Sequence, residues 1–271
     1  MLTRFIEGLL SSPAWIKMIA LSVQGITVRR IYSDGREEHR DDVVAKDVPV
    51  CLFVNGEPYR TLIASPGMLE ELAVGHFYTE AVISSLEDIV ELAVKPNRVD
   101  VTLDREIDLL ETQMATYRLL TTACGAATQK SSVSGLKWVA PGDGFDPSLI
   151  RTLVKALNDR SSVFKETGGT HSALLHSETM EVFAEDVGRH NALDKVIGAG
   201  LLNGVDFSGC VLGSSGRLAG EMVLKAAKAS IPLVFSVSAP LLSGIRVAEE
   251  AGITLIGFVR GNRMNVYTRS H

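Results

Sequence analysis

The C-terminal part of the chain alternates short apolar runs with segments of helical periodicity, and this alternation limits the folds it can adopt. Strand-like runs at residues 210–212, 233–237 and 253–258 are separated by helical patterns at 221–229 and 245–251. Strands that alternate with helices pair in a parallel or mixed sheet, whose faces the helices cover. The pattern therefore predicts an α/β architecture for this region.

The same architecture extends upstream. A helix with one apolar side is predicted over Pro147–Arg160, and Ser172–Leu175 and Glu181–Ala184 are predicted as paired strands. A further helix is predicted through Asn191–Ile197. We assign residues 146–271 to one α/β domain with a mixed sheet and flanking helices.

The first part of the chain has a different pattern. Strand-like alternation begins near Ile26, and the pairs Asp34-Gly35 and Asn55-Gly56 have the composition of hairpin turns. Ser65-Pro66-Gly67 precedes a helix with an apolar face. We predict a smaller α+β domain over residues 19–112.

Two segments fall outside these domains. Residues 1–18 are interrupted by charged residues and Pro13, so we interpret them as an N-terminal extension and not as a secretory signal or a membrane helix. Residues 113–145 are rich in Ala, Thr, Ser and Gly. We predict that they form a loop or connection between the two domains.

Charge and cysteine usage argue against several classes of protein. The formal net charge of -5 and the pI near 5.7 argue against a nucleic-acid-binding protein, which would normally carry a basic face. The three cysteines are far apart and odd in number, so no disulfide framework is implied. Reduced thiols favour a cytoplasmic location, and the pattern predicts no association with a membrane.

One cysteine has unusual surroundings. Cys124 lies in a run of small residues, Thr121–Thr128, whereas Cys51 and Cys210 lie in apolar, strand-like runs and are predicted to be core residues. A loop places Cys124 where its sulfur can reach a partner. The alternative is a half-exposed thiol that has no role.

Polar turns follow the predicted strands of the C-terminal domain. Gly213–Arg217 and Ser238–Pro240 each follow a strand, and ligands collect at such carboxyl ends in α/β sheets. Phe258–Arg263 follows the last predicted strand and carries two arginines suited to phosphate or carboxylate groups. For Phe258–Arg263, spacing alone favours the alternative, a solvated turn with ordinary surface charge.

A dense polar cluster follows the strand at 181–184. We predict that Asp186, Arg189 and His190 form a structural network and that Asn191 caps the next helix. Alternatively, a His–Asp pair in this cluster does acid–base work beside the thiol.

A zinc site is a further alternative that the sequence tests directly. His176-Ser177-Glu178 matches one half of the zinc deaminase signature, but the P-C-x-x-C half is absent. Without these thiolates zinc has too few ligands. We therefore predict that His176 and Glu178 lie in a hairpin turn and that the chain binds no zinc.

Together these motifs resemble those of the formate dehydrogenase accessory sulfurtransferases, the FdhD family. The resemblance covers roughly Ile19 to the C-terminus. A run as long as its longest match is hard to meet by chance. The matching segments are Phe183–Lys195, Ser215–Arg217 with Glu221–Val223, Ser238–Pro240 and Gly261–Tyr267.

The resemblance implies a sulfur carrier with sulfurtransferase activity. In the family, a loop cysteine accepts sulfur from a cysteine desulfurase as a persulfide and passes it to the molybdenum cofactor before insertion into formate dehydrogenase. That cysteine corresponds to Cys124. The family fold resembles cytidine deaminases without their zinc chemistry, which implies a cytidine-deaminase-like domain at 146–271.

The resemblance also implies how the cofactor, a molybdenum bis(molybdopterin guanine dinucleotide), is bound as a substrate. Its two nucleotide arms are consistent with a homodimer. The family's cofactor-binding stretch corresponds to Phe258, Val259, Arg260, Gly261, Asn262 and Arg263.

The chain departs from the family at the sulfur site. The family usually has C-G-x-C, and here Ala127 occupies the position of the second cysteine. A disulfide within this loop is impossible, although a persulfide needs only one thiolate. The alternative function is a chaperone that binds the molybdenum cofactor without transferring sulfur, and the missing cysteine favours it.

Overall fold

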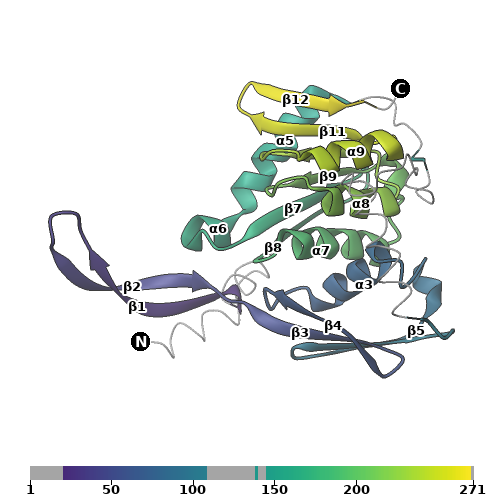
Figure 1. The fold of residues 1–271 in the computed structure, drawn as a ribbon, viewed down its shortest axis with the longest axis horizontal. Helices are drawn as coiled ribbons and strands as arrows, with labels where there is room; N and C mark the ends of the chain where they lie inside the picture. The colour runs from purple at the N-terminus through teal and green to yellow at the C-terminus, as the bar shows by residue number, and fades with distance from the viewer. Residues whose placement is uncertain (1–20, 109–137, 140–144, 270–271) are drawn as a thin grey trace, which may run out of the picture.

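Three β-sheets organise the described part of the protein (Figure 1). The computed structural model describes residues 21–108, 138–139 and 145–269. A six-stranded sheet belongs to the C-terminal half, a four-stranded sheet to the N-terminal half, and a two-stranded hairpin projects to one side. The predicted mixed α/β architecture is confirmed.

The six-stranded sheet combines parallel and antiparallel pairs. Its three central strands β11, β10 and β9 are parallel, whereas β12, β7 and β8 pair antiparallel with their neighbours. Five of these strands fall where the sequence predicts them, but β12 was missed. In sheet order the strands are β12 (Arg263–Thr268), β11 (Thr254–Arg260), β10 (Leu233–Ser236), β9 (Val211–Ser214), β7 (His171–His176) and β8 (Glu181–Asp186).

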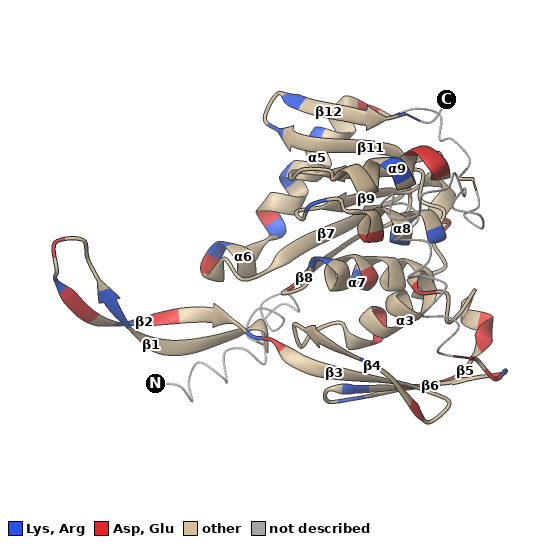
Figure 2. Cartoon of the chain, in the orientation of Figure 1, with Lys and Arg blue, Asp and Glu red and all other residues tan. Residues whose placement is uncertain are grey.

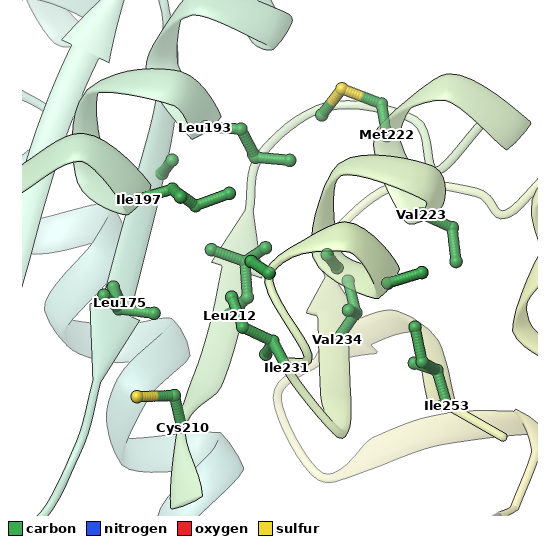
Figure 3. Packing of buried hydrophobic residues seen from close by; sticks show 14 of the residues in the cluster. Leu175, Leu193, Ile197, Cys210, Leu212, Met222, Val223, Ile231, Val234 and Ile253 are labelled. Carbon is green, nitrogen blue, oxygen red and sulfur yellow. The ribbon is translucent and has the colours of Figure 1, made fainter. Parts of the chain in front are cut away.

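Helices cover both faces of this sheet. The helix α5 (Pro147–Arg160) packs on one face through its buried apolar side, and the short α6 (Ser162–Thr167) follows it. The helices α7 (Arg189–Leu202), α8 (Gly220–Lys228) and α9 (Leu242–Ala251) pack on the other face. Successive strand residues point to opposite faces, so both apolar layers are filled. Figure 3 shows the second layer.

The four-stranded sheet has a helix on one face. Its strands are β4 (Glu57–Ala64), β3 (Val48–Val54), β6 (Arg98–Leu103) and β5 (Ile89–Lys95), in that order, with the 3-10 turn η1 (Leu86–Asp88) before β5. The helix α3 (Leu69–Thr79) buries its apolar side chains against β3 and β6. The small mixed unit predicted from the sequence is present, and β5 is an addition.

The two sheets meet through a close crossing of α3 and α7, which lie between them (Figure 1). A Cβ atom at Gly75 would overlap the carbonyl oxygen of Asp194, and one at Gly198 would overlap that of Glu71. Only glycine at these two positions lets the helix backbones approach so closely. Sequence periodicity gave no sign of this contact.

The third sheet is a projecting hairpin of β1 (Val23–Ile31) and β2 (Glu37–Ala45), joined by the predicted turn at Asp34-Gly35. Figure 2 shows that it carries side chains of both charges. No helix within the described part of the chain is long and apolar enough to cross a membrane.

Candidate functional site

The polar turns singled out in the sequence lie at one edge of the six-stranded sheet. The strands β8, β9 and β10 end at this edge, and β7 begins there because it runs antiparallel to β8 and β9. We call this the carboxyl edge. Side chains that follow these strands are therefore brought together, as ligand-binding groups are in other α/β sheets.

Hydrogen bonds hold the serine turns of the carboxyl edge together. The Ser214 hydroxyl accepts from the Gly216 amide at 3.0 Å, and the Ser236 hydroxyl donates to the Gly216 carbonyl at 2.7 Å. Ser236 also accepts from the Ser238 amide at 2.9 Å. These hydroxyls stabilise the turn backbone, so they are already engaged within the fold.

Three basic residues gather beside these turns, and we call them the basic cluster: His171, Arg189 and Arg217. The His171 Nδ1 atom lies 3.4 Å from the Ser215 hydroxyl, which accepts from the Ser172 amide at 2.8 Å. Burial, together with the positive charges of the two arginines, holds the pKa of His171 below its usual value. Sequence reasoning missed His171, because a single histidine at a strand start gives no signal.

The predicted network of Asp186, Arg189 and His190 is wrong. Asp186 is fully buried and pairs with Lys195 at 2.6 Å. It also accepts from the Gly188 amide at 2.8 Å and the Asn191 side chain at 2.9 Å. Arg189 and His190 do not contact it through any hydrogen bond or ion pair in the described chain.

The helix cap was also wrongly assigned. Gly188 occupies the cap position of α7, and Asn191 lies within the helix. The Asn191 amide donates to the Ile63 carbonyl at 2.7 Å and so links α7 to β4. His190 Nε2 lies 3.0 Å from Glu221, not from an aspartate. The polar cluster is therefore mainly a junction between the two halves of the protein.

The segment Phe258–Arg263 forms a hairpin end instead of the turn predicted after the last strand. Arg260 is the last residue of β11, Arg263 is the first of β12, and the two residues pair. A register shift and a positive φ of 50° at Phe258 bend the strand. The Phe258 amide donates to the Ser238 carbonyl at 3.0 Å, which attaches this hairpin to the carboxyl edge.

The side chains of this segment face different environments. Arg260, Asn262 and Arg263 are exposed and open to a ligand, whereas Val259 is 2% exposed and packs against α5. Val259 can therefore offer only its backbone. A cavity of about 290 Å³ adjoins the segment and is lined by Arg151, Val154, Lys155, Asn158, Asp159, Val259 and Gly261.

The cysteines differ in what the structure says of them. Cys124 lies outside the described residues. Cys210 is 1% exposed among apolar side chains such as Leu175 (Figure 3). Burial and the nearby charge of Asp206 raise its pKa to about 11. Cys51, predicted as a core residue, is partly exposed on β3, where its sulfur accepts from the Thr61 hydroxyl at 3.7 Å.

A second set of polar and charged residues lies where α3, α7 and α8 meet. We call it the helix seam, and it consists of His76, Thr79, Glu80, Asp194 and Lys225. The ammonium of Lys225 lies 2.9 Å from Asp194 and 3.2 Å from Glu80. Asp194 also accepts from Thr79 at 2.8 Å and from His76 Nδ1 at 3.1 Å.

The pairing in the helix seam decides its charge states. Burial opposes ionisation of Asp194, but Lys225 and His76 outweigh it and lower the pKa of Asp194 to about 2. Burial likewise opposes the Lys225 ammonium, but Asp194 and Glu80 raise the pKa of Lys225. Burial lowers the pKa of His76, which remains neutral and donates to Asp194.

The described residues offer no cluster of three or more His, Cys, Asp or Glu side chains that could hold a metal ion. His176 ends strand β7, where its ring lies 3.5 Å from Glu181. Glu178 lies in the turn that follows, as predicted.

Comparison with known proteins gives a consistent result. The model of the FdhD/NarQ family matches residues 45–271. A protein named sulfur carrier protein FdhD from Shouchella clausii (strain KSM-K16) is 36% identical over 245 residues, covering 88% of this chain and 92% of the relative. One of the same name from Bacillus subtilis (strain 168) is 34% identical over 249 residues, covering 88% and 92%.

A solved structure shares the fold. The crystal structure of a protein from Desulfotalea psychrophila, described as a formate dehydrogenase accessory protein, superposes with a TM-score of 0.74. It is 26% identical in sequence, and the match covers 91% of this chain and 96% of that one.

Proposed function

The chain belongs to the FdhD/NarQ family, and from this premise we propose that it is a sulfur carrier required for formate dehydrogenase activity. It accepts sulfur from a cysteine desulfurase as a persulfide on Cys124. It then passes this sulfur to the molybdenum cofactor before the cofactor enters formate dehydrogenase. Relatives named sulfur carrier protein over most of the chain's length support the role.

The contrast among the three cysteines carries the assignment to Cys124. Cys210 is sealed in the core with its pKa raised to about 11, so almost none of it is thiolate at neutral pH. Cys51 lies on β3 in the four-stranded sheet, whereas the family's C-G-x-C site corresponds to Cys124. Cys124, among small residues, is the remaining candidate.

The transfer onto Cys124 is a thiol exchange. The Cys124 thiolate attacks the outer sulfur of the desulfurase persulfide, the sulfur–sulfur bond breaks, and the desulfurase cysteine leaves as a thiolate. No oxidant is needed. Release of the outer sulfur as sulfide needs a second thiol as reductant, and Ala127 means that this thiol comes from outside the Cys124 loop. Reduced thiols of this kind persist in the cytoplasm, where we place the reaction.

The carboxyl edge and the adjoining hairpin supply the cradle for the cofactor, which is cargo and not a resident group. Exposed Arg260 and Arg263 flank the Gly261-Asn262 turn and can bind the phosphates of a guanine dinucleotide arm. The cavity beside Gly261 gives such an arm room. The six-stranded mixed sheet with helices on both faces also supports a cytidine-deaminase-like topology for residues 146–271.

Mass measurement tests the proposal. After incubation with a cysteine desulfurase and L-cysteine, the wild-type chain should gain the mass of one sulfur atom, and C124A should not. C51A and C210A serve as matched controls and should gain it. A persulfide that survives in C124A would contradict the assignment.

The missing second cysteine favours one alternative, a chaperone that holds the molybdenum cofactor without transferring sulfur. This alternative requires C124A to restore formate dehydrogenase activity in a strain that lacks its own copy. The sulfur carrier proposed here requires C124A to fail in that strain.

A further inference from the structure

The basic cluster is assembled from three separate segments of the chain. His171 begins β7, Arg189 begins α7, and Arg217 lies in the turn after β9. A Cβ atom built at Gly216 would lie 3.0 Å from the Cβ of Arg189, so the arginine side chain crosses directly over this glycine. The cluster is therefore a packed arrangement at the carboxyl edge, and Figure 2 shows basic residues where α7 begins.

Neighbouring carboxylates are occupied by other partners. Asp186 binds Lys195, and Glu221 lies against His190. Glu185 accepts from the Val163 and Phe164 amides at 3.0 and 2.9 Å and from the Thr170 hydroxyl at 2.9 Å. Among the described residues, none forms an ion pair with Arg189 or Arg217.

The cluster also leaves a buried donor without an acceptor. The Nε atom of Arg189 is shielded from solvent and has no hydrogen-bond partner among the residues that the structure describes. Buried donors in folded proteins are almost always paired, so an orphan donor at a ligand-binding edge points to an absent acceptor. Burial lowers the pKa of His171, and the positive charges of Arg189 and Arg217 near its ring lower it further, which agrees with this geometry.

We propose that His171, Arg189 and Arg217 form a second anion-binding site, which takes a phosphate or pyrophosphate group. Two guanidinium groups present planar pairs of donors that match the oxygens of a phosphate, and its negative charge relieves their mutual repulsion. The amino end of α7, where Arg189 stands, adds a partial positive charge.

The site lies at the ends of β7, β8 and β9, whereas the Phe258–Arg263 hairpin joins β11 and β12, so β10 lies between them in the sheet order. A cofactor with two nucleotide arms carries two pyrophosphate groups, and two separate anion sites would hold both. The natural ligand thus rests on the proposed function. The binding site itself does not, because it can be tested with an anion that carries no sulfur, pterin or base.

Calorimetric titration of the full chain with inorganic pyrophosphate tests the site. Arg217 is exposed and makes no ion pair with another described residue, so R217Q should fold normally and bind pyrophosphate at least tenfold more weakly. R217K keeps the charge but loses the paired donors, and it should fall between wild type and R217Q. R40Q removes an exposed arginine from the hairpin of β1 and β2 and should bind like wild type.

Two further titrations identify the source of binding. Sulfate should bind more weakly than pyrophosphate, since it has fewer oxygens and less charge. R263Q should retain the part of the pyrophosphate binding that R217Q loses. Equal affinity in wild type and R217Q, an equal loss in R40Q, or no binding to wild type would overturn the proposal. A chain that forms no persulfide on Cys124 but binds pyrophosphate through Arg217 would refute the sulfur carrier and leave this site standing.

Discussion

Helix α7 passes through two electrostatic environments: in one its charged residue has no carboxylate partner, and in the other each charged residue is paired. Its first turn carries Arg189 at the carboxyl edge, where the described chain supplies no carboxylate for it. One and a half turns later Asp194 and Lys195 are fully buried, and each has a partner of opposite charge. Charges in the helix seam are thus satisfied within the fold, and those of the basic cluster are not.

The difference separates stability from binding. A buried charge that lost its partner would be desolvated without compensation, so every charge of the helix seam needs its partner for the folded state to be stable. The basic cluster is partly exposed to solvent, so its charges stay hydrated and do not need a partner within the fold. We therefore expect substitutions in the helix seam to change the free energy of unfolding, and those in the basic cluster to change affinity for anions.

The largest effect should come from removing a carboxylate of the helix seam. D194A leaves Lys225 with Glu80 as the one carboxylate it contacts among the described residues, and leaves His76 and Thr79 without their shared acceptor. Breaking a buried ion pair in this way costs about 3–5 kcal/mol, which urea unfolding monitored by circular dichroism would measure.

An exposed aspartate provides the matched control. Asp159 lies near the end of α5 and is exposed, so D159A should change the free energy of unfolding by less than about 0.5 kcal/mol. If D194A and D159A lowered the free energy of unfolding by the same amount, the helix seam would stabilise the protein no more than an exposed residue does.

The next effect concerns the close crossing beneath the helix seam. G198A places a methyl group onto the Glu71 carbonyl and forces α3 and α7 apart. Overpacking of this kind should destabilise the protein by about 2 kcal/mol, even though alanine favours a helix over glycine by about 1 kcal/mol. G209A is the control, because an added Cβ there meets open space. A G198A protein as stable as G209A would contradict the crossing.

The sequence predicted the elements better than their contacts. Period-two and helical patterns identified most strands and helices, because local apolar spacing determines them. The strand β12 and the partners of Asp186 and Asp194 could not be predicted, since they depend on which segments meet in space. Lys195 illustrates this limit: a lysine in a helix is expected at the surface, and only the tertiary contact with Asp186 explains its burial.

The candidate site shows the same division. Composition marked Gly213–Arg217, Ser238–Pro240 and Phe258–Arg263 as polar segments after strands, and the structure brings them to one edge. Composition could not show that the serine hydroxyls are used within the turns, or that His171 joins them from the start of β7. The position of His171 follows from the antiparallel placement of β7 between β8 and β9.

A smaller effect should appear as a pH dependence. Burial lowers the pKa of His76, so the unfolded chain takes up a proton near pH 6.5 that the folded chain refuses. Stability should therefore fall as the pH drops below about 6.5, by at most about 1.4 kcal/mol per pH unit for this one group. Asp194, whose pKa is about 2, remains ionised in this range and contributes its own loss only between about pH 4 and 2.

Two histidine variants assign this slope. H76Q should flatten the dependence of the unfolding free energy on pH between 6.5 and 5, as followed by urea unfolding at several pH values. H171Q should flatten it less, because His171 is only partly buried at the carboxyl edge, although its pKa is lowered in the same direction. If H171Q flattened the pH dependence of the unfolding free energy more than H76Q did, the pH-sensitive group would lie at the carboxyl edge and not in the helix seam.

The smallest effect on stability should come from the basic cluster itself. Arg217 is exposed, has no ion-pair partner in the described chain, and lies near the like charge of Arg189. R217Q should therefore leave the free energy of unfolding within about 0.5 kcal/mol of wild type. Relief of like-charge repulsion would make any change a slight gain, which low salt would enlarge and high salt would remove.

The salt dependence of stability distinguishes an arginine that stabilises the fold from one that binds a ligand. A structural arginine would make R217Q less stable at every ionic strength, because lost packing and hydrogen bonds are not screened. An arginine held for a ligand makes wild type the less stable protein at low salt, and added pyrophosphate should raise its midpoint of unfolding while leaving that of R217Q nearly unchanged. A clear loss of stability in R217Q without pyrophosphate would show that Arg217 already has a stabilising partner within the fold, as the charges of the helix seam do.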